Sequence, residues 1–263
     1  MLDWHHINWL YSLSGFFVGI LVGLTGVGGG SLMTPLLVLL FGIAPGTAVG
    51  TDLLYAAITK SSGVLVHGFH KTIDWRIVRR LATGSVPATI LTIFMLSRLG
   101  VDNHHGGRDL ISTTLGVALV LTAISIVFRR QILVRLAPFV DGLSDKSRLA
   151  LTIVLGFVLG VFVSISSVGA GAIGVTVLIL LYPALPTVRI VGADIAHAVP
   201  LTLIAGAGHW FLGSVNWEIL FSLIIGSVPG IMISSHLASR VPDHILRPLL
   251  AGTLAVVGLR LAI

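Results

Sequence analysis

Residues 49–87 read VGTDLLYAAITKSSGVLVHGFHKTIDWRIVRRLATGSVP, and residues 191–229 read VGADIAHAVPLTLIAGAGHWFLGSVNWEILFSLIIGSVP. The two stretches align without a gap at a spacing of 142 residues. Identical pairs include Gly50 and Gly192, Asp52 and Asp194, His67 and His209, Trp75 and Trp217, and both Gly-Ser-Val-Pro runs. A spacing of 141 residues also aligns Gly15, Gly19, Gly28 and Gly30 with Gly156, Gly160, Gly169 and Gly171. The chain is therefore built from two related halves.

The composition excludes a soluble globular enzyme. Of the 263 residues, 55% are hydrophobic and only 10% are charged, whereas a soluble domain carries roughly 25% charged residues. Apolar runs lie near residues 7–25, 31–43, 50–68, 81–97, 110–128, 149–168, 172–184, 191–210, 218–237 and 248–263. They predict an all-α polytopic membrane protein with eight to ten membrane segments. The absence of cysteine excludes disulfides, thiolate metal sites and thiol catalysis.

The positive charges predict how the chain crosses the bilayer. Nine of the 16 Lys and Arg residues lie in two connectors, residues 71–80 and 129–148. Both connectors are predicted to be cytoplasmic, which places both chain termini on the outer side, and the net charge of +6 is then an orientation signal rather than the mark of a nucleic-acid partner. Each half holds five segments, and an odd number inverts the second half. We therefore predict an N-terminal repeat (1–128), a basic connector (129–148) and an inverted C-terminal repeat (149–263), an architecture typical of secondary transporters.

Two segments, residues 31–43 and 172–184, are too short as helices to cross a hydrocarbon core of ~30 Å. Each follows a break rich in glycine or serine, and a break inside a bilayer must be buried in protein or line a wet cavity. The free N–H groups that begin the following helix favour an anion. The alternative is that the glycines only allow close helix packing. The predicted substrate-binding residues of the two breaks are Thr25, Gly26, Gly28, Gly29, Gly30, Ser31, Ser166, Ser167, Gly169 and Gly171.

Ionisable residues inside membrane segments are costly, so they are candidates for function. Lys60 could supply a fixed positive charge to an anion pathway, or it could form a structural ion pair with an aspartate. Asp52 and Asp194 either carry protons or are acids in the first turn of a helix. His197 is one turn from Asp194 and is the candidate proton relay. The equivalent residues His67 and His209 are expected to pack or hydrogen bond near opposite faces, without sharing a metal ion.

The spacing of the glycines from Gly15 to Gly30, followed by Pro35, by Gly-Thr-Asp-Leu-Leu at 50–54, by Asp74-Trp75 and by Gly-Ser-Val-Pro at 84–87, resembles the TauE/SafE family of sulfite and organosulfur-anion exporters. The likeness covers almost the whole chain. It implies a bacterial inner-membrane protein of two related halves that exports sulfite or a small sulfonate-type anion by using the proton gradient.

The preferred hypothesis is thus a proton-coupled secondary transporter that exports a small anion by alternating access. Its expected partners are a small inorganic or organosulfur anion, protons and the lipid bilayer, with no cofactor, resident metal or nucleic acid, and we also consider a homodimer. A second hypothesis is a proton-coupled cation or metal-ion permease that uses Asp52, Asp194, His67, His197 and His209. An intramembrane protease is disfavoured because the repeat places neither Ser61 or Ser62 with a histidine, nor Asp52 with Asp194, at one depth. A membrane subunit that serves a partner protein stays open.

Overall fold

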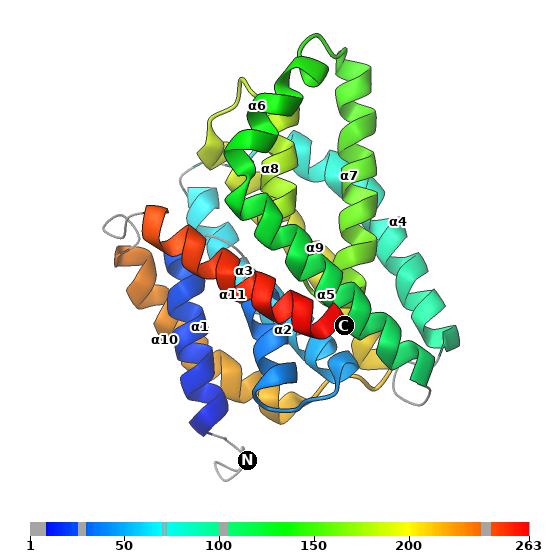
Figure 1. The fold of residues 1–263 in the computed structure, drawn as a ribbon, viewed down its shortest axis with the longest axis vertical. Helices are drawn as coiled ribbons and strands as arrows, with labels where there is room; N and C mark the ends of the chain where they lie inside the picture. The colour runs from blue at the N-terminus through cyan, green and yellow to red at the C-terminus, as the bar shows by residue number, and fades with distance from the viewer. Residues whose placement is uncertain are drawn as a thin grey trace.

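The computed structural model describes residues 9–25, 30–69, 71, 73–99, 105–237 and 243–262, and within them the chain forms helices and no strand (Figure 1). The helices are α1 (Trp9–Thr25), α2 (Gly30–Leu39), α3 (Pro45–Phe69), α4 (Trp75–Leu99), α5 (His105–Val127), α6 (Arg129–Val140), α7 (Asp145–Ser166), α8 (Ala172–Leu181), α9 (Thr187–Phe211), α10 (Trp217–Leu237) and α11 (Asp243–Ala262). Each of the ten predicted segments corresponds to a helix.

The outer surfaces of the long helices are apolar. The helices α4, α7 and α9 and the part of α5 from Leu110 to Val127 are long and apolar enough to cross a membrane. Large side chains such as Ile90 and Phe94 on α4 and Val154 and Phe157 on α7 are about half exposed. An apolar surface of this extent is unfavourable in water and matches lipid. The chain is therefore a multi-pass membrane protein with an all-helical fold.

Several helices begin before the apolar runs that predicted them, and in α3 and α9 the difference changes the interpretation of an acid. α3 and α9 begin at Pro45 and Thr187, several residues before the apolar runs do, because their first turns are less apolar. Asp52 and Asp194 therefore lie in the third turn of their helices, and neither helix has an acid in its first turn. The role of helix-start acid is thereby excluded for both.

The basic connector, residues 129–148, is more ordered than a loop, because it contains the helix α6. No residue of α6 is buried, and its exposed side chains include both Arg135 and the apolar Val134 and Phe139. A helix with one charged and one apolar set of exposed side chains is typical of the membrane surface.

Two helix pairs approach each other through glycine. α1 lies beside α10, and α4 lies beside α7 (Figure 1). At each crossing a glycine on either helix faces a backbone carbonyl so closely that a Cβ atom would overlap its oxygen. The four glycines, each with the residue whose carbonyl it faces, are Gly84 with Ile153, Gly156 with Leu81, Gly226 with Ser12, and Gly15 with Leu223. The two crossings use equivalent residues of the two halves, and small residues of this kind are what membrane helices need for close contact.

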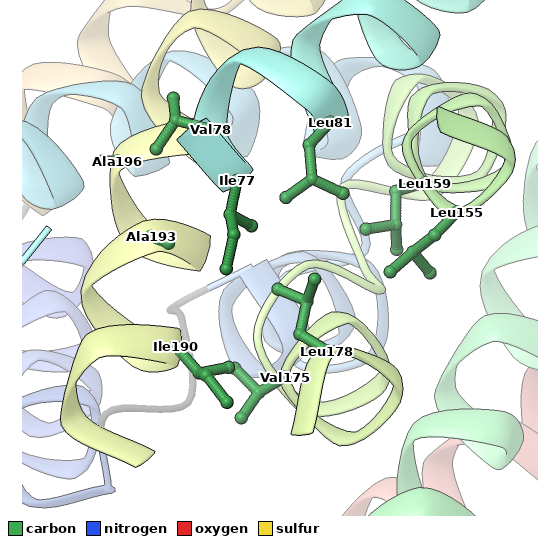
Figure 2. Close-up of a cluster of buried hydrophobic side chains, with 10 residues drawn as sticks. All are labelled: Ile77, Val78, Leu81, Leu155, Leu159, Val175, Leu178, Ile190, Ala193 and Ala196. Atoms are coloured by element: carbon green, nitrogen blue, oxygen red, sulfur yellow. The ribbon is translucent and has the colours of Figure 1, made fainter. Parts of the chain in front are cut away.

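The hydrophobic core also has two equivalent parts. In the first unit, α10 packs with α1, α2 and α3 through residues such as Leu223, Val18 and Leu37. In the second unit, α4 packs with α7, α8 and α9 through the equivalent Leu81, Leu159 and Leu178 and through Ile190 of α9. Figure 2 shows the side chains of this cluster, which come from all four helices. Each unit therefore combines three helices of one half with the fourth helix of the other half.

The helices α3 and α9 join the two units and run antiparallel. A Cβ on Gly63 would lie 3.4 Å from Ile195, and a Cβ on Gly206 would lie 2.7 Å from the Leu54 side chain. This register places Lys60, on α3, at the level of the turn of α9 that contains Pro200. The middle of the protein is therefore the crossing of the two helices that carry Asp52 and Asp194.

We expect Gly84→Ala and Gly226→Ala to destabilise the protein by similar amounts, on the order of 1–3 kcal/mol each, because each new methyl group would force apart two backbones in contact. The measurement is thermal unfolding in detergent. Gly252→Ala is the matched control, since a Cβ at this helical position meets nothing within 4 Å. Equal stability of all three variants would contradict the packing described above.

Candidate functional site

The side chain of Asp194 meets the beginning of the short helix α8. Asp194 is 2% exposed, and its Oδ1 atom is 2.5 Å from the position that a Cβ on Gly174 would occupy. The carboxylate also interacts with the backbone N–H of Gly171, the N-cap residue of α8. Since a helix N-terminus carries a partial positive charge, Asp194 stabilises the start of α8.

Asp52 makes the equivalent contact in the first half. It is fully buried, and the Thr34 hydroxyl of α2 donates a 2.5 Å hydrogen bond to its Oδ2 atom. The backbone of Thr34 and the hydroxyl of Ser167, which lies in the break between α7 and α8, are also close to this carboxylate. Each aspartate thus contacts the short helix of its own half.

Lys60 lies between the two aspartates. It follows Asp52 by eight residues, about 12 Å along the helix axis, and Gly63, in the next turn of α3, lies against Ile195, the chain neighbour of Asp194 on α9. The charge of Lys60 interacts more strongly with Asp194 than with Asp52, and it also interacts with His197. Lys60 is half-buried, and no described carboxylate is in direct ion-pair contact with it. One cation therefore serves a pair of carboxylates from both halves.

The ring of His197 points to α4 rather than to Asp194. Its Nε2 atom is 2.8 Å from the hydroxyl oxygen of Ser85, and both residues are fully buried. In the other half the equivalent residue is Tyr55, which is near Ser227, the equivalent of Ser85. Sequence reasoning missed this second pair, although the 142-residue spacing aligns Tyr55 with His197 and Ser227 with Ser85.

The break between α7 and α8 holds three residues with positive φ: Ser167 (59°), Gly169 (122°) and Gly171 (113°). Ser166 closes α7 locally, because its hydroxyl donates to the carbonyl of Phe162 (2.7 Å) and accepts from the N–H of Val168 (3.2 Å). The Ser167 hydroxyl is buried without a hydrogen-bond partner. Of the two serines, Ser166 is engaged in the turn and Ser167 is directed to the centre.

Part of the equivalent break lies outside the described residues. These residues are Gly26, Gly28 and Gly29. Thr25 ends α1, while Gly30 and Ser31 begin α2. The side chains of Thr25, Ser31 and His67 belong to the undescribed part.

Several polar atoms at the centre of the protein are buried without a hydrogen-bond partner. They are Asp52 Oδ1, Tyr55 OH, Ser167 Oγ, Asp194 Oδ1 and His197 Nδ1. Each such atom costs about 1–3 kcal/mol if it stays unpaired, so a group of them indicates a place where a ligand, water or proton is accommodated. We call Asp52, Lys60, Ser167, Asp194 and His197 the central site.

His209 has a different environment. Its Nε2 atom is 2.8 Å from the carbonyl oxygen of Ser164, and its Cβ atom would be 2.9 Å from a Cβ on Gly50. This agrees with the expected role in packing and hydrogen bonding. Among the described residues no three His, Asp or Glu side chains are arranged to hold a metal ion.

We expect Thr34→Val to destabilise the protein by about 1–3 kcal/mol, because it removes the donor to the buried Asp52 carboxylate while keeping the shape of the side chain. Thermal unfolding in detergent measures the change. Thr92→Val is the matched control, since the buried Thr92 hydroxyl donates to the carbonyl of Ala88 in its own helix. A loss no larger than that of the control would argue against the Thr34–Asp52 interaction.

Comparison with known proteins places this arrangement in a family. The sequence profile described as "Sulfite exporter TauE/SafE" matches residues 11–261. The chain is 42% identical to the probable membrane transporter protein YjnA of Bacillus subtilis, over 95% of this chain and 97% of the relative. It is 28% identical to the probable membrane transporter protein YdhB of the same organism, over 94% and 96% of the two chains. No solved structure matches it. With a match that spans its helices from α1 to α11, the chain belongs to the TauE/SafE family, a family of membrane transporters and not of enzymes.

Proposed function

We propose that the protein exports a small anion, sulfite or a small organosulfonate, across the bacterial inner membrane, with protons as the coupling ion. Transport proceeds by alternating access between two inverted repeats. The observation that carries the proposal is the central site, in which two carboxylates from opposite halves contact the short helices α2 and α8 and one cation lies between the carboxylates. The family description adds the anion class.

Several equivalent features support inverted repeats, residues 1–128 and 149–263. The turn before α4 contains Lys71 with φ of 53°, and the equivalent turn before α10 contains Gly213 with φ of 77°. Asp74 caps the first N–H groups of α4, as Asn216 caps α10. The segment around the turn before α4 is basic, whereas the segment around the turn before α10 has no cation. This difference in charge favours opposite sides of the membrane for the two turns. The connector 129–148 and the turn at Lys71 are then cytoplasmic, and both termini are outside.

The packing suggests which bodies move. The first unit (α1, α2, α3, α10) and the second unit (α4, α7, α8, α9) each have their own core. Rocking of two such bodies around a site at their boundary is the usual form of alternating access in inverted-repeat transporters. The central site lies at this boundary, because α3 belongs to one unit and α9 to the other.

Lys60 is proposed as the cation that attracts the anion. A charge at this depth is costly and is retained where it faces a pathway. Its equivalent in the second half is Thr202, whose hydroxyl donates to the carbonyl of Ala198 in its own helix, so the two halves share one cation. Ser167, Gly169 and Gly171, together with Ser166 and the glycine-rich break at 25–31, are proposed to line the pathway around it.

We expect Arg76→Cys and Glu218→Cys to be labelled from opposite sides of the membrane. The two residues are equivalent, exposed and in the first turns of α4 and α10, and the chain has no native cysteine. An impermeant maleimide should label Glu218→Cys in intact cells and Arg76→Cys only after the membrane is opened. Labelling of both from one side would reject the inverted repeats.

We expect Lys60→Ala to lower sulfite or sulfonate flux into proteoliposomes by at least about tenfold, which corresponds to about 1.4 kcal/mol of lost binding. Lys146→Ala is the matched control, because Lys146 is an exposed lysine in the first turn of α7. Both variants are first compared with the native protein for folding by size exclusion. Absence of anion flux in the folded native protein would overturn the proposed function.

A further inference from the structure

Each of the short helices α2 and α8 contacts a carboxylate side chain of the protein itself. The first turn of α8 meets the Asp194 carboxylate at Gly171 and Gly174. In the second turn of α2 the Thr34 hydroxyl donates to the Asp52 carboxylate. A carboxylate and a sulfite or sulfonate group present the same chemistry to a helix N-terminus, namely negatively charged oxygens that accept hydrogen bonds. The aspartates therefore occupy the places that favour a transported oxyanion.

We propose that Asp52 and Asp194 compete with the transported anion for the N-terminal half of α2 and the N-terminal end of α8, so that the anion binds together with a proton and both cross the membrane in the same direction. Export is then driven by the outward gradient of the anion, and the proton leaves with it. The inference rests on the proposed function and specifies its coupling. Both carboxylates keep one buried oxygen, Oδ1, without a hydrogen-bond partner. These two atoms are the places at which a proton can be added without breaking a hydrogen bond of the protein.

The charge balance requires the proton. With both aspartates ionised, the central site carries two negative charges and the single positive charge of Lys60. A further anion at this depth would raise the uncompensated negative charge, which is very unfavourable away from water. A proton on one aspartate offsets the charge of a monovalent anion and frees the N-terminal end that this aspartate occupied.

Other ionisable groups do not supply this charge. The other described ones on α3, α9 and the helices that pack against them lie near helix ends, with two exceptions. His197 has its Nε2 atom taken by Ser85, and Tyr55 is a phenol, which cannot supply a positive charge. Those end groups are Arg76, Arg79, Arg80 and Arg98 of α4, Asp145, Lys146 and Arg148 of α7, Arg189 and His209 of α9, and Glu218 of α10.

The proton balance is simple. A proton from the aqueous phase on one side adds to the free oxygen of the aspartate and forms a neutral carboxylic acid. The anion then takes the N-terminal end of the short helix, within reach of Lys60. On the opposite side the anion leaves, the acid releases its proton to that aqueous phase, and the carboxylate returns to the helix. No covalent bond other than O–H is made or broken, and each cycle moves anion and proton together.

The test is the pH dependence of anion binding to the purified full-length protein in detergent. The probes are methanesulfonate and isethionate, whose own charge does not change near neutral pH. We expect the affinity of the native protein to rise as the pH falls, by up to about tenfold per pH unit for each proton taken up. Asp194→Asn cannot compete as a carboxylate, so its affinity should change less with pH. The matched control, Asp145→Asn in the exposed first turn of α7, should keep the native pH dependence.

Proteoliposomes test the direction of coupling. An outward gradient of methanesulfonate should carry protons outward with it, which a pH-sensitive dye inside the vesicles reports as alkalinisation. Native affinity that is independent of pH or that rises with pH, or protons that move against the anion, would overturn the inference while leaving anion transport intact. If only sulfite binds, the native protein is compared with Asp194→Asn, because the titration of sulfite itself is common to both. Absence of binding by every probe at every pH would reject the proposed function as well.

If Asp194→Asn does not fold, the pH dependence of the native protein still decides the question. Asp52→Asn is the second variant, since Asp52 holds the equivalent place on α2. Asparagine at either position that weakens anion binding at all pH values would show that the carboxylate assists the anion instead of competing with it, and would overturn the inference.

Discussion

Backbone groups inside a bilayer must find their hydrogen-bond partners within the protein, and two ten-residue helices cannot meet this requirement alone. The N-terminal halves of α2 and α8 lie inside the protein, so their backbone groups need partners from other helices. The rest of the fold can be understood as the enclosure of these two helices. Each lies against a long helix of its own half, α3 or α9, and receives a carboxylate from that helix, at Thr34 in the second turn of α2 and at the beginning of α8. The carboxylates of Asp52 and Asp194 are themselves costly to bury, and the positive charge of Lys60 between them lowers that cost.

The sequence was sufficient for the helices and for the relation between the halves, because both are recorded in local patterns. Apolar runs of helical length and a fixed spacing of 142 residues need no knowledge of tertiary contacts. It was not sufficient for the exact role of Asp52 and Asp194. Their helices begin with polar and proline-containing turns that do not look like membrane segments, so hydropathy placed the acids too near the helix starts.

The contacts of the central site could not be predicted from local sequence patterns, because they join residues that are distant in the chain. Nothing local to Ser85 indicates that its hydroxyl meets His197, and nothing local to Thr34 indicates a contact with Asp52. The repeat also distinguishes positions within the central site. Aligning the halves position by position pairs His197 with Tyr55 and Lys60 with Thr202, and these are the positions at which two otherwise equivalent sets of contacts differ in chemistry.

The exchange of α4 and α10 between the two units has a consequence for biosynthesis. When the ribosome has delivered the first five segments, α4 already presents Gly84 and Leu81 to the lipid, and the helix that covers them, α7, has not yet been made. The same helix carries the Ser85 hydroxyl, whose partner on α9 arrives later still. In the membrane, the first half therefore leaves the α7-binding surface of α4 uncovered at this stage, and the native packing forms only after the helices of the second half are inserted. A chain severed between the halves would reassemble only if both pieces were made in the same membrane, and a truncated product would expose the surface that membrane quality control removes.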